Sequence, residues 1–371
     1  MDKRTKDNIS MTQFLILTWG ALLSPLIESL LPLEGSLAFL LPLFLLPFFL
    51  LWGLGIGKFC GEGRGLAQGI WDSFGSVLGR VILLAYLLWS CVLLAVQLRL
   101  CGLSFLSVGY REGSLYFILP VLGLFVLWMS GGSFSGFARG STFYFGILFC
   151  VFLLVLLFSL PQVEVLRFFP LWTGEEMFPS GNFLPSFGLF GYGIYASFFW
   201  GEVIWSGETG KEQGKVWCFW GISGCIFLSA YLFIATGIFG AGFLSQLSQP
   251  FFQLSKGIVV EGGFQRVESI VLALWTLGDF ILLGVLLRGG GQCGKRLIGW
   301  NHSPLIMTGI LCISTVLSLF VIEDLPAPFL YWGNVFFAWV FPVVFILTGF
   351  FQKILKKPLQ SGNHCVKIEG D

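Results

Sequence analysis

The chain contains ten apolar runs, most of them long enough to cross a lipid bilayer as a helix. A membrane-spanning helix needs about 20 predominantly apolar residues, and it satisfies its own backbone hydrogen bonds. The runs account for most of the 371 residues, which leaves no room for a separate soluble domain. The sequence therefore predicts one all-α integral membrane domain, with spans at about residues 12–33, 36–57, 75–98, 115–130, 140–160, 185–206, 216–239, 265–287, 304–322 and 328–350.

Composition excludes several classes of function. Only 11 % of the residues are charged, whereas about a quarter are charged in soluble domains, and the net charge is +1. No block of like charges indicates a nucleic-acid partner. The nine cysteines are scattered and the two histidines lie near the end of the chain, so neither a metal site nor a Ser-His-Asp arrangement can be assembled. We expect no catalytic residues, no metal, no cofactor and no enzymatic activity.

The distribution of Lys and Arg predicts the orientation. The charged N-terminal tail, residues 1–11, leads into the first apolar run without a small-residue cleavage site, so we expect that span to be retained. With ten spans, sixteen of the 21 Lys and Arg residues lie on the side of the two termini. Cytoplasmic loops retain positive charge, so the tails 1–11 and 351–371 are both predicted to be cytosolic.

Ten spans can divide into two five-helix halves, 12–160 and 185–350. Transporters built as inverted repeats have opposite topology in their halves, and their first helices are broken near the bilayer midplane. Spans one and six both carry residues that interrupt helices at corresponding places. The sequence thus predicts a LeuT-like five-plus-five inverted repeat with broken helices one and six, the interrupting residues being Gly20 and Pro25 in span one and Gly188, Gly191 and Gly193 in span six.

A broken helix frees backbone groups, which can bind a ligand. A half-helix N-terminus can hold a carboxylate, and freed carbonyls can hold an ammonium group or a cation, so such a site suits an amino acid. The alternative is that these glycines only allow close helix packing. The residues predicted to line the ligand site are Trp19, Gly20, Ala21, Gly191, Tyr192, Gly193 and Tyr195, with Trp275 behind them.

The eighth span contains the segment "GFQRVESIVLALWTLGDF", residues 263–280. Glu268, Leu272, Trp275 and Asp279 follow the i, i+4, i+7, i+11 pattern and share one helix face. A carboxylate inside a span costs about 2.5–3.5 kcal/mol on insertion scales, so Asp279 is expected to face the bundle interior or water. It is a candidate for proton or cation linkage, together with Glu28 and Glu268; a structural hydrogen bond to a neighbouring helix is the alternative.

Other polar residues and one long connection have two interpretations. Gln97 and Glu202 are expected to form hydrogen bonds between helices, with a direct ligand role as the alternative. The connection 240–263 mixes Phe251 and Phe252 with polar residues. It could lie over an outer vestibule, or it could be an interfacial loop without a gating role.

Several segments resemble one known family. Phe264, Arg266, Glu268 and Trp275 resemble the eighth-span signature of the B subunits of spore nutrient-germinant receptors. Similar segments extend over nearly the whole chain, namely "ISMTQFLIL" (9–17), "GFARGSTFYFGILF" (136–149) and "LPQVEVLRFFPLW" (160–172). The chain departs from the family at "GALLSP" in span one, and Asp279 is not part of the signature.

The resemblance implies the amino acid, polyamine and organocation permease superfamily. It also implies a place in the inner membrane of a bacterial spore, beside a larger A subunit and a lipoprotein C subunit. In that family the B subunit binds a small nutrient, often an amino acid, in a transporter-like pocket to trigger germination. An ion-coupled amino acid permease and a membrane scaffold without a ligand are the alternatives.

Overall fold

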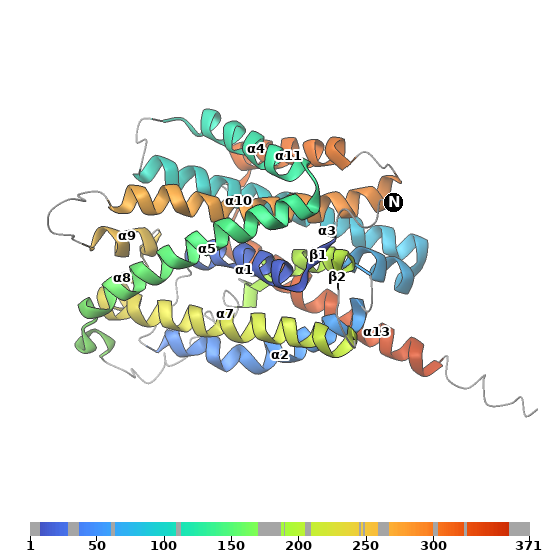
Figure 1. Ribbon diagram of the computed structural model, residues 1–371, viewed down its shortest axis with the longest axis horizontal. Coiled ribbons are helices and arrows are strands. Elements are labelled where there is room, and N and C mark those ends of the chain that lie inside the picture. Colours follow the sequence, from blue (N-terminus) through green and yellow to red (C-terminus); the bar gives the residue numbers. More distant parts are fainter. Residues whose placement is uncertain are drawn as a thin grey trace, which may run out of the picture.

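The structure is a computed structural model and is mostly helical (Figure 1). It describes residues 8–28, 37–60, 64–108, 113–169, 187–188, 190–204, 209–244, 246–247, 249–258, 267–299, 303–322 and 325–355. The elements of the first half of the chain are β1 (Ile9–Ser10), α1 (Met11–Glu28), η2 (Ala38–Leu40), α2 (Leu41–Cys60), α3 (Leu66–Val108), α4 (Leu115–Gly131), α5 (Phe134–Ser159), η3 (Leu160–Gln162) and η4 (Val165–Phe168). Those of the second half are η5 (Phe190–Glu202), β2 (Val203–Ile204), α7 (Thr209–Phe239), α8 (Ala241–Leu244), α9 (Pro250–Lys256), α10 (Val267–Ile298), α11 (Ser303–Phe320), α12 (Ala327–Val335), η7 (Phe336–Val340) and α13 (Phe341–Leu355).

Among the residues that the structure describes, seven helical segments are long and apolar enough to cross a membrane, which supports a multi-pass membrane protein. They belong to spans two, three, five, seven, eight, nine and ten of the sequence prediction. Three further segments, α1, α4 and η5, lie at the places predicted for spans one, four and six. The total of ten spans stays a prediction.

Two helices extend well beyond their predicted spans. α3 begins at Leu66 rather than near residue 75, and it bends at Gly75, whose φ is 73°. α10 continues to Ile298 and has 32 residues, which corresponds to about 48 Å, well beyond a hydrocarbon core of about 30 Å. The predicted ends were wrong because hydropathy marks where the apolar stretch ends, whereas a helix can continue through polar residues outside the hydrocarbon.

The core of the bundle lies where α10 packs along α3 (Figure 1). α10 also contacts α1, α5, α11 and η5. α2 packs along α7 at one side of the bundle, and α4 packs against α11 at the other. Helices from the two halves of the chain are therefore interleaved, and α10 is in contact with helices of both halves.

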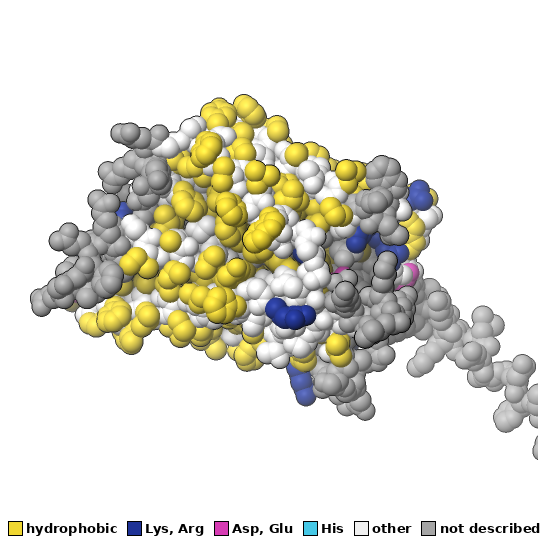
Figure 2. Space-filling view, turned by 45° about the horizontal axis from the view of Figure 1, so that its top comes forward, with side chains coloured by type: hydrophobic (Ala, Val, Ile, Leu, Met, Phe, Trp, Pro, Cys, Tyr) yellow, Lys and Arg dark blue, Asp and Glu magenta, His cyan; other side chains and the backbone are white. Residues whose placement is uncertain are grey.

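The lateral surface is largely apolar (Figure 2). Large side chains on several helices are mostly exposed, among them Leu51, Val77 and Trp128. Lys and Arg side chains gather mainly toward one end of the face shown. A band of exposed apolar side chains is what a bilayer requires of a membrane protein, because lipid takes the place of a protein neighbour.

The first span departs from the prediction. α1 runs as one continuous helix from Met11 to Glu28, with Pro25 inside its last turn. The break predicted at Gly20 is not observed, because Gly20 keeps helical geometry while Ile281 of α10 packs against it; an added Cβ would lie 2.9 Å from Ile281 Cγ2. Gly20 therefore serves close packing between α1 and α10.

The sixth span is irregular, as the sequence suggested, but in a different form. η5 is a 3₁₀ helix of 13 residues, much longer than the usual run of three or four. Its backbone hydrogen bonds run from i to i+3, so the chain is narrower than an α-helix at this depth. The glycines Gly191 and Gly193 lie in its first turns.

A short sheet joins the start of the first span to the end of the sixth. β1 pairs in parallel with β2, with Ile9 opposite Val203 and Ser10 opposite Ile204. α1 begins directly after β1 with a reciprocal cap, in which the Ser10 N–H donates to Gln13 Oε1 at 3.1 Å and the Gln13 N–H donates to Ser10 Oγ at 3.2 Å. The start of α1 is thereby joined to the end of η5.

The tenth span contains a π-helical segment, η7. Two of its carbonyls accept hydrogen bonds from other helices: Tyr86 Oη donates to Phe337 O at 2.7 Å, and Trp52 Nε1 donates to Ala338 O at 2.5 Å. The wider turn leaves carbonyls free to bond sideways, so donors from α2 and α3 stabilise it.

Candidate functional site

Three buried polar side chains meet between α1, α3 and α10. The Ser24 hydroxyl on α1 donates a short hydrogen bond to Asp279 Oδ1 on α10. The Gln97 amide on α3 donates to Ser24 Oγ at 2.9 Å and to Asp279 Oδ1 at 3.3 Å. Every member of this cluster bonds to both others, so it joins three helices that are distant in the sequence.

The cluster is isolated from solvent. Gln97 and Ser24 are 0 % exposed and Asp279 is 2 % exposed. A buried polar group is costly unless it is hydrogen-bonded, and a buried carboxylate is more costly still. The bonds from Ser24 and Gln97 offset part of that cost, which accounts for three polar residues meeting in an apolar core. The bond between Gln97 and its neighbours is the interhelical hydrogen bond that the sequence predicted.

The helix face predicted for the eighth span points into the bundle. Leu272, Trp275 and Asp279 are all buried on α10. Arg266 lies outside the described residues, and the side chains of Glu28 and Glu268 are also not described. Of the three predicted ion-linkage residues, the structure therefore gives side-chain contacts for Asp279.

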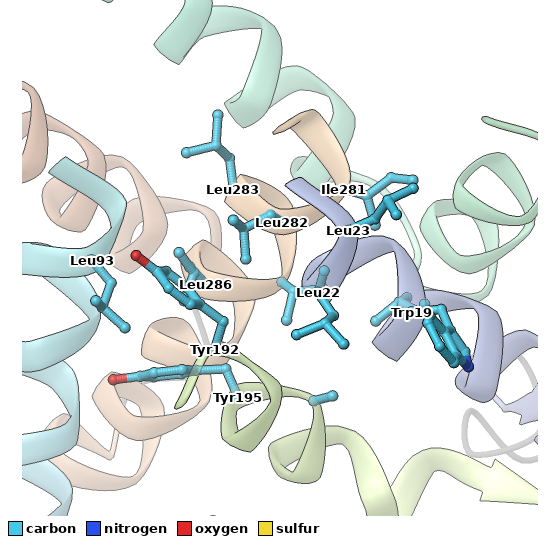
Figure 3. Packing of buried hydrophobic residues seen from close by; sticks show 14 of the residues in the cluster. Trp19, Leu22, Leu23, Leu93, Tyr192, Tyr195, Ile281, Leu282, Leu283 and Leu286 are labelled. Atoms are coloured by element: carbon cyan, nitrogen blue, oxygen red, sulfur yellow. The ribbon is translucent and has the colours of Figure 1, made fainter. Parts of the chain in front are cut away.

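The predicted ligand residues pack against different neighbours, and their role in ligand binding stays a prediction. Trp19 points away from the tyrosines and packs edge-on against Phe227 of α7, with the ring centroids 5.4 Å apart (Figure 3). Tyr192 and Tyr195 extend from η5 toward Leu93 of α3. Leucines of α10 lie near these side chains, and all three aromatic residues are buried. The aromatic side chains of α1 and η5 thus point in different directions, although the two elements are in contact.

The glycines of η5 are in close contact with other helices. An added Cβ at Gly191 would lie 2.9 Å from Asn334 Cβ, and one at Gly193 would overlap the Trp220 ring. Together with Gly20, these contacts favour the close-packing interpretation of the glycines. Ala21 is likewise fully buried.

An aromatic cluster surrounds Trp275. Phe251 of α9 lies 4.9 Å from Trp275, 5.8 Å from Phe152 and 6.2 Å from Tyr231, measured between ring centroids. Among the residues that the structure describes, neither the Trp275 Nε1–H nor the Tyr231 hydroxyl has a hydrogen-bond partner, although both side chains are fully buried. Buried polar groups normally have partners, so this is a place where a polar ligand could be bound.

The segment α9 covers this aromatic cluster. Phe251, Phe252 and Leu254 are buried against the bundle. Gln249, at the start of α9, has a φ of 64°, and its Nε2 donates to Ser104 Oγ of α3 at 2.6 Å. The connection is packed onto the bundle rather than lying loosely on its surface, whereas its role in gating stays a prediction.

A second polar contact lies between the ends of η5 and α10. Gln292 Nε2 donates to Glu202 Oε1 at 3.0 Å, which is the interhelical bond expected of Glu202. Two cavities border this pair, one of about 230 Å³ and one of about 410 Å³. Arg288 and Lys295 line the first cavity, and Arg64 and Arg296 line the second.

Arg288 is held at the rim of the first cavity. Its Nη2 donates to Gly132 O at 2.8 Å, and its guanidinium lies over the rings of Phe134 and Phe137 at 5.6 and 5.0 Å. Apart from Glu202, the charged side chains that line the two cavities are cationic. Among the described residues, no group of three His, Cys, Asp or Glu side chains could hold a metal ion.

Some of these residues were not identified from the sequence. Ser24 was missed because serine is common in membrane helices, and its only signal is its position one turn beyond Gly20. Tyr231 was missed because it lies in an ordinary apolar span. Neither residue has a sequence signal that shows which helix its side chain will meet.

Comparison with known proteins identifies the family and the fold. A sequence model of the family described as "Spore germination protein" matches residues 48–325. No curated protein matches the sequence at a significant level. The fold is similar to that of "MhsT in complex with L-phenylalanine", with a TM-score of 0.66 and 12 % identity over 92 % of this chain and 88 % of that chain. It is also similar to the outward-open state of "a Na+-coupled sialic acid symporter", with a TM-score of 0.60 and 12 % identity over 94 % of this chain and 79 % of that chain.

Proposed function

Because the chain belongs to the spore germination protein family, we propose that it is the nutrient-binding membrane subunit of a spore germinant receptor. Binding of a small nutrient, such as an amino acid, would trigger germination. The observation that carries this proposal is the family match, which spans more than half of the chain. The transporter-like fold supports it, because a fold of this kind offers a site among its central helices. The family and the similar folds are those of permeases and transporters rather than of enzymes.

The proposal includes the wider setting that the family implies. The chain would lie in the inner membrane of a spore, with both termini cytosolic, and would act with A and C subunits. Its halves, 12–160 and 185–350, would form an inverted repeat. The packing of α2 on α7, α3 on α10 and α4 on α11 supports the repeat, because each pair joins a helix to the one five spans later.

We place the nutrient between η5, α1 and α10, next to the aromatic cluster of Phe152, Tyr231, Phe251 and Trp275. Trp275 and Tyr231 offer polar groups without a partner among the described residues, and these could bind the polar ends of an amino acid. The predicted residues Trp19, Gly20, Ala21, Gly191, Tyr192, Gly193 and Tyr195 would line the site after a rearrangement that opens the packed interface. A ligand drives such a change only by its preference for one state.

Germination of spores tests this function directly. Disrupting the gene should abolish germination by one nutrient while vegetative uptake of that nutrient is unchanged. Within the intact chain, Tyr231→Phe should weaken the nutrient response by about tenfold, which corresponds to about 1.4 kcal/mol, a typical value for one buried hydrogen bond. Tyr116→Phe is the matched control, since Tyr116 is 64 % exposed on α4. A disrupted strain that germinates normally with every nutrient would refute the proposal.

An ion-coupled amino acid permease is the second candidate. It is favoured by the fold likeness to a Na+-coupled symporter and by the two cavities at the end of η5 and α10, which such a carrier could use for release. Uptake of a radiolabelled amino acid into proteoliposomes separates the two functions. Accumulation driven by an ion gradient would favour the permease, whereas saturable binding without accumulation would favour the receptor.

A further inference from the structure

We infer that Ser24, Gln97 and Asp279 form a proton-binding site, and that the Gln97 amide responds to the protonation of Asp279. The three side chains come from α1, α3 and α10 and are fully or almost fully buried. The inference goes beyond the proposed function, because a proton could bind here in a receptor and in a permease alike. It concerns which ion binds and which bonds change when it does.

The observed bonds suit an ionised carboxylate, which only accepts hydrogen bonds. Asp279 Oδ1 accepts from the Ser24 hydroxyl and from the Gln97 amide, whose N–H also donates to Ser24 Oγ. Both neighbours thus direct donors toward the acid. The orientation of the amide follows from this network, because nitrogen and oxygen in an amide are distinguished by their hydrogen-bond partners.

Protonation would reverse one of these bonds. A proton from water adds to one oxygen of the Asp279 carboxylate, so its charge changes from −1 to 0 and it gains an O–H donor. A half-turn of the Gln97 amide then presents Oε1 as the acceptor for that O–H. The same three side chains stay bonded, but the direction of the bond between α3 and α10 changes. Each state of the acid therefore has its own orientation of the Gln97 amide.

A proton suits this cluster better than a metal cation. A hard cation requires several oxygen ligands at once, whereas a proton needs a single lone pair. Here an N–H and an O–H already point at Asp279 Oδ1, and the Gln97 nitrogen occupies a place where a cation would need an oxygen. The two neighbours of the carboxylate in this cluster are also neutral, so the net charge of the cluster depends on this one proton.

The charged groups on the surrounding elements have contacts elsewhere or lie far along their helices. Arg99 Nη1 on α3 donates to Ser318 O of α11 at 2.9 Å. Glu202 of η5 is bonded to Gln292, and Arg288 to Gly132 O. Arg80 precedes Gln97 by 17 residues on α3, which is about 26 Å along the axis. The other titratable groups on these elements include Cys101 on α3, Arg139 on α5, Lys256 on α9, Lys295 and Arg296 on α10, Cys312 on α11, and Tyr192 and Tyr195 on η5; the side chains of Glu28 and Glu268 are not described.

Infrared difference spectroscopy of the full chain in proteoliposomes, titrated with pH and without nutrient, tests the inference. Lowering the pH should produce the C=O band of a protonated carboxylic acid in wild type, and Asp279→Asn should remove it. Asp72→Asn is the matched control and should keep the band, because Asp72 is a partly exposed carboxylate bonded to Gln68 at the start of α3. Failure of the nutrient response would leave this result unaffected, so the two proposals can fail separately.

Gln97→Leu tests the amide while keeping the carboxyl group. It removes the bond to the ionised form and the weaker bond to the protonated form, so the midpoint of the band should move to higher pH by about one unit. Ser24→Ala should act in the same direction and serves if Asp279→Asn does not fold. An Asp279-dependent band that is absent at every pH, a midpoint unchanged in both variants, or a band displaced by Na⁺ at constant pH would each overturn the inference.

Discussion

Two carboxylates of this protein accept a hydrogen bond from a glutamine amide, yet their surroundings differ. Asp279 accepts from Gln97 at 3.3 Å in a buried cluster, and Glu202 accepts from Gln292 at 3.0 Å beside two cavities. Water can enter the second site, and cationic side chains line it. Both sites contain the same pair of groups, a carboxylate and a glutamine amide. The comparison therefore teaches that access to water decides how much the stability of a site depends on that hydrogen bond.

A third carboxylate completes the series. Glu164 lies outside the membrane spans and is exposed, and it accepts from Arg167 Nε at 2.8 Å. The carboxylate of Asp279 is therefore buried, that of Glu202 lines cavities, and that of Glu164 is exposed to solvent. Water can replace a lost partner at the third site and not at the first, so the effect of removing a partner should fall along the series.

The largest effect is expected at Asp279. Asp279→Leu leaves the Ser24 hydroxyl and the Gln97 amide buried without their acceptor, which should lower the free energy of unfolding by about 2–3 kcal/mol. Glu202→Leu should cost about 1 kcal/mol or less, because water in the cavities can bond to Gln292. Thermal unfolding of both variants in detergent measures the difference. Equal losses would mean that the two sites do not differ in hydration.

A smaller effect is expected at Gly193, where η5 packs against Trp220 of α7. Gly193→Ala places a methyl group where the Trp220 ring lies, so overpacking should lower the free energy of unfolding by about 1–3 kcal/mol. Gly140→Ala on α5 is the control, since an added Cβ there meets open space and alanine favours a helix. If Gly193→Ala has the same free energy of unfolding as wild type, η5 is loosely packed at Gly193 as well as beside the cavities at Glu202.

The smallest effect is expected at Glu164. The hydrogen bond from Arg167, and then its charge, hold the pKa of Glu164 below its ordinary value. A lowered pKa in the folded state stabilises the protein above the ordinary value, and this contribution is lost as the pH falls through the lowered one. Arg167→Ala should therefore lower the unfolding temperature slightly at neutral pH, and this loss should disappear as the pH falls through the lowered pKa. A large loss of stability at neutral pH would contradict full solvation of this pair.

Much of the fold could be predicted from the sequence. The apolar runs predicted the membrane helices, and in the part of the chain that the structure describes seven of them are helices long and apolar enough to span a bilayer. The 3.6-residue period predicted that Leu272, Trp275 and Asp279 share a face, and all three are buried. The break in span one was wrong, because the effect of a glycine depends on the side chain that packs against it, and Ile281 fills the space beside Gly20.

The partners of the site residues could not be predicted. Trp19 and Tyr192 were expected to line one pocket, yet one packs toward α7 and the other toward α3 (Figure 3). Ser24 carries no sequence signal that distinguishes it from other serines in membrane helices. Both outcomes depend on how each helix is rotated about its axis, and a single sequence does not determine that rotation.

The sequence by itself determined that the chain lies in a membrane, where its helices run and which residues of one helix share a face. These properties follow from hydropathy and helical period, which are local. The tertiary structure decided that Asp279 meets Ser24 and Gln97, while Glu202 meets Gln292 beside the cavities. Such contacts depend on the packing of helices that are distant in the sequence, because the solvent exposure of a carboxylate is set by the helices that pack around it.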